Sequence, residues 1–316
     1  MTIHQQTDRQ PASPPVIDYE GSQYETDFWV GRGRAYEDAV ERIALRQLLP
    51  PSGRRIAEIG AAFGRLVDLY QGYEQIILLD YSRSQLQTAA QRLGGDPRYV
   101  FVAGNIYSLP FVDGILDTLV MVRVMHHLAN VPDALSELKR VMHSQSSAVV
   151  EYANKRNLKA LVRWWSKRQD WSPHALEPVE FVKLNFDFHP DWMSERLYEA
   201  NFLVKEQFAV SHFRLGLLKQ TVPTAFLAEM DRLLFGVGGR YPVSPSVFVQ
   251  LQVQRTTAQP AQISTNPNDV TQLFRCPKCN STPLHKTEED SLLCTSCKSR
   301  YTKKLGVWDF KDSVED

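Results

Sequence analysis

Apolar residues follow two rhythms that alternate along most of the chain. In one rhythm they form short unbroken runs, which are typical of strands buried on both faces. In the other they return at every third or fourth position, as on one face of a helix. Strands flanked by helices in this way predict an α/β fold with a parallel, doubly wound sheet. The predicted strands are Ile56–Ile59, Ile76–Leu79, Tyr99–Ala103, Leu119–Val122 and Ala148–Val150, and the clearest helices are Arg34–Leu49 and Ser82–Leu93, the latter with Ser82 as N-cap.

The later part of the chain predicts an antiparallel hairpin at one edge of this sheet. A helix at Pro190–Ala200 precedes a strand at Phe202–Phe208, and a last strand at Ser246–Val253 follows a turn rich in Gly and Pro, GVGGRYPVSP. The polar stretch QRTTAQPAQISTNPND then has no periodicity and indicates a linker. We therefore expect a disordered tail at 1–20, a main domain at 21–255 with an N-terminal helical lid, a linker at 256–270 and a separate module at 271–316.

Composition narrows the class of protein. Lys and Arg number 36, as do Asp and Glu, so the chain as a whole has no basic footprint for nucleic acid. No apolar run is long enough to cross a membrane, and the amino-terminal sequence MTIHQQTDRQPASPP is unlike a signal peptide. All four cysteines lie beyond the linker, which argues against a scattered disulfide framework. We expect a cytoplasmic protein.

A glycine loop follows the first predicted strand, in the stretch AEIGAAFGR. Strand, glycine loop and helix together bring backbone N–H groups and a helix N-terminus against a polar ligand. The spacing of Gly60 and Gly64 fits the nicotinamide fingerprint G-x-G-x-x-G badly. Asp80 ends the next strand, where a carboxylate can accept both hydroxyls of a ribose. The loop therefore predicts a site for a ribose-containing ligand other than a nicotinamide dinucleotide.

Glu58, Gly60 and Gly64 resemble the first motif, E/D-x-G-x-G-x-G, of class I S-adenosylmethionine-dependent methyltransferases, with Ala62 in place of the middle glycine. The resemblance continues through ILLDYS, GNIYSLPF and DTLVMVRVMHHLANVPDALSELKRV, covers about residues 34–253, and is closest to the ubiquinone/menaquinone type. It implies a Rossmann-like, seven-stranded doubly wound sheet that binds S-adenosylmethionine. Ala62 resists a positive φ, but its side chain is small enough that we expect binding to survive. The cofactor-binding residues that the resemblance implies are Glu58, Gly60, Ala62, Gly64, Asp80, Tyr81, Asn105, Ile106 and Arg123.

The resemblance also implies in-line transfer of a methyl group to an acceptor. His126 and His127 follow the fourth strand, and either could act as a base or merely pack the next helix. The motif [DN]-P-P-[YFW] for planar nitrogens does not occur, and no cysteine is left for attack on a pyrimidine. We expect a small-molecule acceptor. Because Ala62 and Asn105 depart from the family pattern, a non-catalytic module that binds S-adenosylmethionine is an alternative.

A basic stretch, NKRNLKALVRWWSKRQDW, covers residues 154–171. Its apolar residues Leu158, Leu161, Val162 and Trp165 fall on one helix face. Two interpretations stay open: the apolar face packs on the sheet and leaves a solvated basic face, or the helix makes peripheral contact with a membrane.

The carboxyl-terminal module contains two C-x2-C pairs separated by fourteen residues. Four thiolates at this spacing predict a closed, structural zinc site, with a pair of redox disulfides as the alternative. The module resembles the small zinc-ribbon protein that activates tRNA, rRNA and translation-factor methyltransferases. It could stabilise the enzyme, bind a protein partner or bind RNA, so methylation of RNA or of a translation protein is an alternative function. We expect the main domain to fold and bind cofactor without it. The predicted metal ligands are Cys276, Cys279, Cys294 and Cys297.

Overall fold

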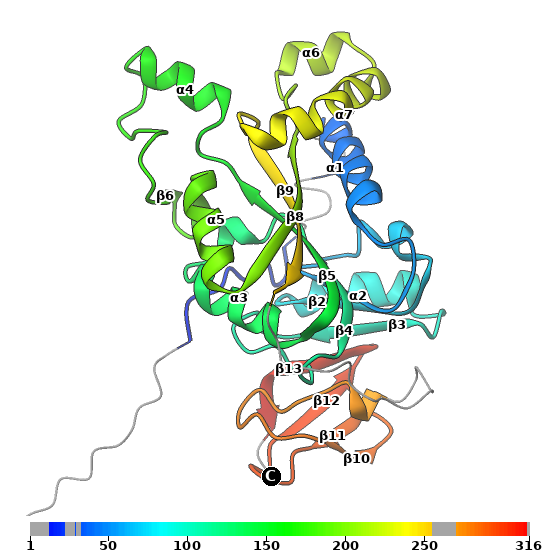
Figure 1. Cartoon of the computed structure of the whole chain (residues 1–316). Coiled ribbons are helices and arrows are strands. Elements are labelled where there is room, and N and C mark those ends of the chain that lie inside the picture. The colour runs from blue at the N-terminus through cyan, green and yellow to red at the C-terminus, as the bar shows by residue number, and fades with distance from the viewer. Residues whose placement is uncertain (1–12, 23–28, 30–32, 255–269, 315–316) are drawn as a thin grey trace, which may run out of the picture.

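The structure is a computed structural model that describes residues 13–22, 29, 33–254 and 270–314. A twisted sheet with helices on both faces forms its centre, and the carboxyl-terminal ribbon continues the sheet at one edge (Figure 1). The predicted fold class, a Rossmann-like α/β sheet with a small cysteine-containing carboxyl-terminal unit, is confirmed.

Among the described residues, eleven strands form this sheet in the order β10-β11-β12-β13-β3-β2-β1-β4-β5-β9-β8. The seven strands from β3 to β8 are those expected for the main domain, and the ribbon adds the other four. β1 pairs in parallel with β2 and β4, whereas β9 is antiparallel to both β5 and β8, which confirms the predicted hairpin at the edge. The strands are β1 (Gly53–Ile59), β2 (Tyr73–Asp80), β3 (Tyr99–Ala103), β4 (Leu116–Met121), β5 (Met142–Ala153), β8 (Phe202–Val210), β9 (Ser246–Val253), β10 (His285–Glu288), β11 (Ser291–Leu293), β12 (Arg300–Lys304) and β13 (Val307–Val314).

Two apolar clusters lie on the two faces of the sheet. Successive side chains of a strand point to opposite faces, and β2 accordingly sends Ile77 and Leu79 into one cluster and Ile76 and Leu78 into the other. Helices α3 and α5 pack in the first cluster, and α1, α2 and α7 in the second. The hydroxyl of Ser82 accepts the N–H of Gln85 at the start of α2, which confirms the predicted N-cap. The helices are α1 (Ala35–Leu48), α2 (Arg83–Leu93), α3 (Val131–Arg140), α4 (Leu158–Trp165), α5 (Pro190–Glu199), α6 (Gly216–Thr221) and α7 (Thr224–Arg240), with short 3-10 turns η2 (Val67–Tyr70), η3 (Met125–His127) and η4 (Val270–Gln272).

The predicted turn GVGGRYPVSP is wrong in its first half, because α7 continues to Arg240 through three glycines. The helix passes so close to β8 that a Cβ atom on Gly239 would lie 2.0 Å from the carbonyl oxygen of Gln207. The glycines thus permit close helix–strand packing, and they do not end the helix.

The ribbon joins the sheet through its own backbone. β13 pairs in parallel with β3, placing Val307, Trp308 and Asp309 opposite Phe101, Val102 and Ala103. Val307 packs in one apolar cluster, whereas Trp308 and Phe310 pack in the other, as expected for a strand covered on both faces. The ribbon therefore shares the core of the main domain, and the apolar clusters run through the predicted boundary.

A long excursion leaves the sheet after β5. It contains α4 and a two-stranded hairpin, β6 (Val179–Val182) and β7 (Asn185–Asp187). Within α4 only Ala160 is buried, so the interpretation in which its apolar face packs on the sheet is wrong. The helix extends away from the sheet edge (Figure 1), and its apolar face meets solvent.

Candidate functional site

The glycine loop turns sharply at the carboxyl end of β1. Gly60 and Gly64 have φ of 76° and 75°, and Ala62 also lies in the left-handed region with φ of 46°. The N–H groups of Gly60 and Ala61 both donate to the carbonyl oxygen of Leu79, at 2.7 and 3.0 Å. A Cβ atom on Gly60 would lie 2.1 Å from Cγ2 of Val124, so no larger residue fits there. Ala62 thus adopts the backbone conformation for which the sequence pattern predicts glycine.

Asp80 ties this loop to the end of β2. Its two carboxylate oxygens accept the N–H groups of Ala62 and Ser82, each at 2.8 Å. Burial raises the pKa of Asp80 above its usual value, although these hydrogen bonds act in the opposite direction. The backbone of Tyr81 is a third donor to this carboxylate, and of its roughly four acceptor positions one is left for a ligand hydroxyl.

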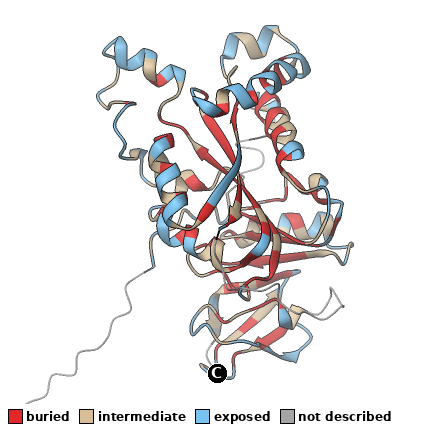
Figure 2. Ribbon diagram, viewed as in Figure 1, coloured by how far each residue is buried: buried red, intermediate tan, exposed pale blue. Residues whose placement is uncertain are grey.

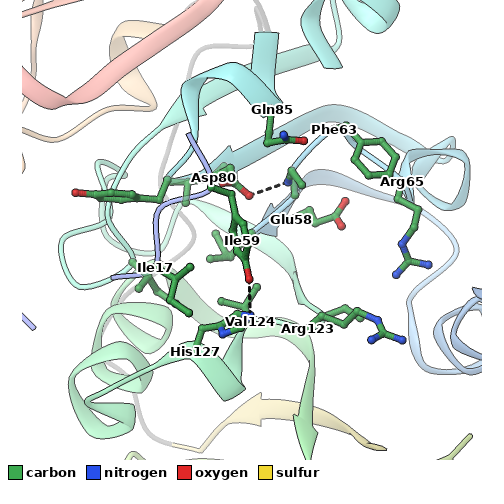
Figure 3. Close-up of a pocket in the computed structure, with 18 of the residues that line it drawn as sticks. Ile17, Glu58, Ile59, Phe63, Arg65, Asp80, Gln85, Arg123, Val124 and His127 are labelled. Carbon is green, nitrogen blue, oxygen red and sulfur yellow. Dashed lines mark hydrogen bonds between the residues drawn. The ribbon is translucent and has the colours of Figure 1, made fainter. Parts of the chain in front are cut away.

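A cleft with about 970 Å³ of empty space opens beside the loop (Figure 3). Figure 3 shows Asp80 and His127 on opposite sides of it, with the carboxylate of Glu58 directed toward the side of Arg65. The predicted residues Gly64, Asn105 and His126 do not belong to its described lining. The predicted residues that do line it are Glu58, Gly60, Ala62, Asp80, Tyr81, Ile106, Arg123 and His127.

Asn105 and Gly64 support the site from behind its lining. The side-chain oxygen of Asn105 accepts the N–H of Tyr107 at 3.0 Å, and its amide donates to Ser13 Oγ at 3.2 Å. Gly64 closes the loop by donating its N–H to the carbonyl oxygen of Ala61 at 2.8 Å.

Glu58 is a buried acid without a partner for one of its oxygens. The side chain is 5% exposed, and Oε2 has no hydrogen-bond partner among the described residues. Burial raises the pKa of Glu58 to about 7, and Arg65 opposes this rise only in part. Tyr70 also acts on this carboxyl group and lowers its pKa, but Oε2 has no partner in the described chain and can accept a hydrogen bond from a cationic ligand group.

Arg123, whose φ is 60°, joins a buried ionic network at the other end of the loop. Arg123 and Arg65 both pair with the carboxylate of Glu41, which is 1% exposed. Burial alone would raise the pKa of Glu41, but the two arginines outweigh it and bring it to about 2. The ring of Trp29 lies 3.9 Å from the Arg65 guanidinium and 5.0 Å from that of Arg123. Both arginines are therefore held rigidly beside the cleft.

The two predicted histidines differ in their surroundings. His127 Nδ1 lies 3.1 Å from the carbonyl oxygen of Leu184 and must carry a hydrogen to donate, which leaves Nε2 as an acceptor. The hydroxyl of Tyr19 lies 3.3 Å from this Nε2. Burial lowers the pKa of His127, and burial together with His127 lowers that of His126 far more. His126 Nδ1 is buried without a partner in the described chain.

Residues 13–22, which the sequence assigns mostly to the tail, cross the mouth of the cleft, and we call them the N-terminal strap. Val16, Ile17 and Tyr19 line the cleft directly. The carboxylate of Glu20 accepts the N–H groups of Arg83 and Ser84 at 2.7 and 3.0 Å, at the amino end of α2. An acid at this position also complements the helix dipole.

The ribbon reaches the rim of the same cleft. Arg83, at the start of α2, donates two hydrogen bonds to Asp309, at 2.6 and 3.1 Å. Lys311 pairs with Asp18 of the strap at 3.1 Å and lies 3.8 Å from the centre of the Tyr81 ring. Residues of β13 thus hold both the strap and an aromatic side chain that lines the cleft.

The four cysteines gather at one point of the ribbon. Their Sγ atoms all lie within 4.8 Å of one another, and none forms a disulfide. The Sγ atoms of Cys276 and Cys297 lie 3.6 Å apart, and those of Cys279 and Cys294 lie 3.4 Å apart. Four sulfurs bound to one zinc at about 2.3 Å have similar separations, so the donor set fits the ion.

Comparison with known proteins supports the interpretation of the sheet. The model of the family described as "Methyltransferase domain" matches residues 57–150. Over 97 residues the chain is 27% identical to a 2-phytyl-1,4-naphtoquinone methyltransferase of Trichormus variabilis, which covers 29% of this chain and 42% of that protein. Over 143 residues it is 24% identical to a malonyl-[acyl-carrier protein] O-methyltransferase of Legionella pneumophila, which covers 44% of this chain and 49% of that protein. The chain thus spans less than half the length of these relatives.

Two solved structures share the fold. A protein assigned as a methyltransferase, in complex with the Trm112 methyltransferase activator of Haloferax volcanii, aligns with a TM-score of 0.51 and 15% identity over 72% of this chain and 95% of that chain. A protein assigned as an S-adenosylmethionine-dependent methyltransferase from Listeria monocytogenes aligns with a TM-score of 0.50 and 13% identity over 70% of this chain and 99% of that chain. The fold is that of a methyltransferase.

Sequence reasoning missed several residues that line the site. Arg65, Val16, Ile17 and Tyr19 line the cleft. The aromatic residues Tyr24, Phe28 and Trp29 in the sequence also suggest an apolar lid, with packing against the sheet as the alternative, and Trp29 lines the cleft. Tyr24 and Phe28 lie outside the described residues. Arg65 stands directly after the loop motif and offered a local signal. Nothing in the polar N-terminal sequence indicated that it would return to the cleft.

Proposed function

We propose that the protein transfers a methyl group from S-adenosylmethionine to a small-molecule acceptor. The observation that carries this proposal is the pair of carboxyl groups beside the loop, Glu58 with an unpartnered buried oxygen and Asp80 with acceptor capacity left after its backbone hydrogen bonds. S-adenosylmethionine presents an ammonium group and a ribose diol, which need acceptors of this kind. The family match over residues 57–150 supports the same cofactor.

The residues that would hold the cofactor divide by chemistry. Glu58 would accept from the ammonium group, and Asp80 from a ribose hydroxyl. Tyr81 and Ile106 line the same cleft and would flank the nucleoside, and Arg123 lines the opposite end of the loop. When bound, the sulfonium supplies an electrophilic methyl group, so the work of the protein is to orient the two reactants and exclude water.

His127 is the residue that we propose as the base. Its Nδ1–H donates to Leu184, so Nε2 carries a lone pair on the cleft side. Because burial lowers its pKa, the ring is neutral near pH 7 and can accept a proton from a hydroxyl, a carboxyl or an acidic carbon. The hydroxyl of Tyr19 donates to this lone pair at 3.3 Å, so the acceptor molecule would have to take its place at Nε2 before it gives up a proton. His126, with its much lower pKa and no place in the lining, is the weaker candidate.

The pH dependence of cofactor binding tests the role of Glu58. In the free protein its pKa is about 7, and an ammonium group needs the ionised form. Below pH 7 binding must first remove a proton, so we expect affinity to fall as the pH is lowered, by up to about tenfold per pH unit. Above pH 7 affinity should level off until the amino group of the ligand itself deprotonates. Calorimetric titration across this range measures the profile.

Two controls make this titration decisive. Glu58→Gln should weaken binding and flatten the profile, because the amide cannot ionise. 5′-Methylthioadenosine, which lacks the ammonium group, should show a flat profile with the unmodified protein. If S-adenosylmethionine itself binds without any pH dependence, Glu58 is not its partner, and if it does not bind at all, the proposed function is wrong.

Turnover separates the enzyme from a non-catalytic binding module. Incubation with candidate acceptors, including a quinol and an acyl carboxylate, should release S-adenosylhomocysteine. His127→Gln should lower the rate for an acceptor that must lose its proton and leave cofactor affinity nearly unchanged. Tight binding without turnover on any acceptor class would favour the binding module.

We also propose that Cys276, Cys279, Cys294 and Cys297 hold one structural zinc ion. The set of four sulfurs leaves no open position on the metal, so the ion would stabilise the ribbon and take no part in methyl transfer. Metal analysis should find one zinc per chain, and Cys294→Ser should lose it. The ribbon is then the counterpart of the activator seen with the Haloferax methyltransferase, carried on the same chain and covering the edge of its own sheet.

A further inference from the structure

Exposed apolar side chains gather on the segments that follow β5 and β8. On α4 the side chains of Leu158, Val162 and Trp165 are 62%, 54% and 79% exposed. Leu217 on α6 and Val237 on α7 are 73% and 78% exposed. Figure 2 shows α4 and α6 mostly in the colour of exposed residues. Apolar residues at this density go beyond the scattered exposure that is normal on a protein surface.

These segments belong to one end of the molecule. β5 and β8 run in the same direction, because both are antiparallel to β9. The segments that follow these two strands therefore start at the same end of the sheet, the end where β5 and β8 finish. The N–H of Leu158 donates to the carbonyl oxygen of Val243 at 2.7 Å and joins the start of α4 to the segment after α7. Figure 1 shows α4 and α6 projecting at the end opposite the ribbon. We call the exposed faces of α4, α6 and α7 the carboxyl-edge surface.

The α4 part of this surface carries positive charge. Lys159, Arg163, Lys167 and Arg168 stand between or directly after its apolar residues, and none forms an ion pair with a described residue. Arginine and tryptophan are common at protein interfaces, but lysine is depleted at their centre, and Lys159 and Lys167 stand beside the apolar residues of this helix. Basic residues beside exposed Trp and Leu are instead typical of helices that lie on an anionic membrane surface.

Among the described residues, no helix is both long and apolar enough to span a membrane. We propose that the carboxyl-edge surface binds the surface of an anionic lipid bilayer, with the apolar side chains of α4 at the level of the acyl chains and its Lys and Arg at the lipid phosphates. The charge complementarity selects an anionic bilayer, and the apolar area on α6 and α7 adds to the contact.

Bilayer binding would also present the cleft to lipid-soluble molecules. The hairpin that follows α4 contacts the site through Leu184, whose carbonyl oxygen accepts from His127. This consequence for the acceptor rests on the proposed function, whereas binding to the bilayer does not. Vesicle binding without turnover would therefore leave the inference standing, and turnover without vesicle binding would overturn only the inference.

Sedimentation of the full chain with vesicles tests the proposal. Vesicles of phosphatidylcholine with a minor fraction of phosphatidylglycerol should bind the protein, and vesicles of phosphatidylcholine alone should bind it weakly. Lys159→Gln combined with Arg163→Gln should reduce binding to the anionic vesicles by about tenfold or more, and added salt should act in the same direction. Trp165→Ala should reduce binding severalfold on both kinds of vesicle.

Matched variants on the ribbon serve as controls. Lys286→Gln combined with Lys304→Gln removes two exposed charges, and Leu305→Ala removes a side chain that is 76% exposed, all at the far end of the molecule. These variants should bind vesicles like the unmodified chain. The proposal is overturned if anionic lipid gives no enhancement, if the ribbon variants lose as much binding as the α4 variants, or if light scattering shows a dimer that Trp165→Ala dissociates.

Discussion

The β3 edge of the sheet and the carboxyl-edge surface both carry large apolar side chains, but only the first has them covered. At β3 the ribbon supplies a strand that completes the backbone hydrogen bonding, and its Phe274, Trp308 and Phe310 are buried. On α4, Trp165 and Leu158 face solvent. An open strand edge invites aggregation, and here the chain provides its own cover. The second surface has no cover of this kind among the described residues, and it is the surface for which we propose an anionic bilayer.

Charge follows the same division. Where the ribbon meets α2, Arg83 is paired with Asp309, and Lys311 is paired with Asp18. The basic residues of α4 form no such pairs among the described residues. Where the ribbon meets α2, both of these positive charges are already paired with a carboxylate. The positive charges of α4, which are unpaired in the described chain, can still attract an anionic partner.

Removal of residues 256–316 should have the largest effect on stability, because it uncovers the edge of the sheet that the ribbon protects. Truncation would expose the edge of β3 and the face of Phe111, which the ribbon covers through Phe274. We expect a loss of stability greater than the about 3–5 kcal/mol of a single large-to-small core substitution. Cofactor binding should weaken as well, because Lys311 no longer holds the strap and Tyr81. Thermal unfolding and calorimetry measure both effects.

The sequence alone leads to the opposite expectation for this truncation, a domain that folds and binds cofactor without the ribbon. If the shortened chain unfolds at the same temperature and binds S-adenosylmethionine equally well, the shared core contributes nothing and the ribbon is an independent module. Leu305→Ala, in an exposed turn of the ribbon, is the control for a change that leaves the interface intact.

The parts of the fold that could be predicted are those with a local signal. Buried strands of a parallel sheet are continuous apolar runs, so β1 to β5 could be predicted from the short runs of apolar residues in the sequence. The cysteine cluster was found because two short spacings define it. The pairing of β13 with β3 joins residues about two hundred positions apart, and no local pattern reports such a contact. Helix α7 was not predicted, and its last five residues, GVGGR, were predicted as a turn because glycine has the same sequence signature in a turn and in a tight helix–strand contact.

The direction in which a side chain or a helix face points was harder to predict than the periodicity of the sequence. The apolar stripe of α4 was found correctly, but a stripe does not say whether it faces a core or a solvent. In the site, Glu58, Asp80 and the loop lie where the motif predicts. The side chain of Asn105 instead accepts the backbone N–H of Tyr107 and donates to Ser13. Tyr19 was missed because its position depends on the path of the strap.

Substitution of one tryptophan on each surface compares how much buried and exposed apolar side chains contribute to stability. Trp308 is 4% exposed and contacts Phe274 edge-on, with ring centres 5.9 Å apart. Trp308→Ala should therefore destabilise the protein by about 3–5 kcal/mol. Trp165→Ala, on the carboxyl-edge surface, should change stability by less than about 0.5 kcal/mol. Urea unfolding gives both free energies, and equal losses would mean that α4 is packed in solution.

A pair of charge substitutions gives the smallest expected effect. Arg83 and Asp309 are 27% and 18% exposed in their side chains and make a two-pronged pair, so Asp309→Asn should cost about 1 kcal/mol. Arg163→Gln removes a charge with no ion-pair partner among the described residues, leaving only its interaction with the dipole of α4, and should cost less than about 0.5 kcal/mol. Urea unfolding at low and at high salt separates them, because salt should shrink the first loss and leave the second near zero. A salt-sensitive stability loss for Arg163→Gln as large as that for Asp309→Asn would exceed the contribution of the helix dipole and would show that α4 has an acidic partner within the protein.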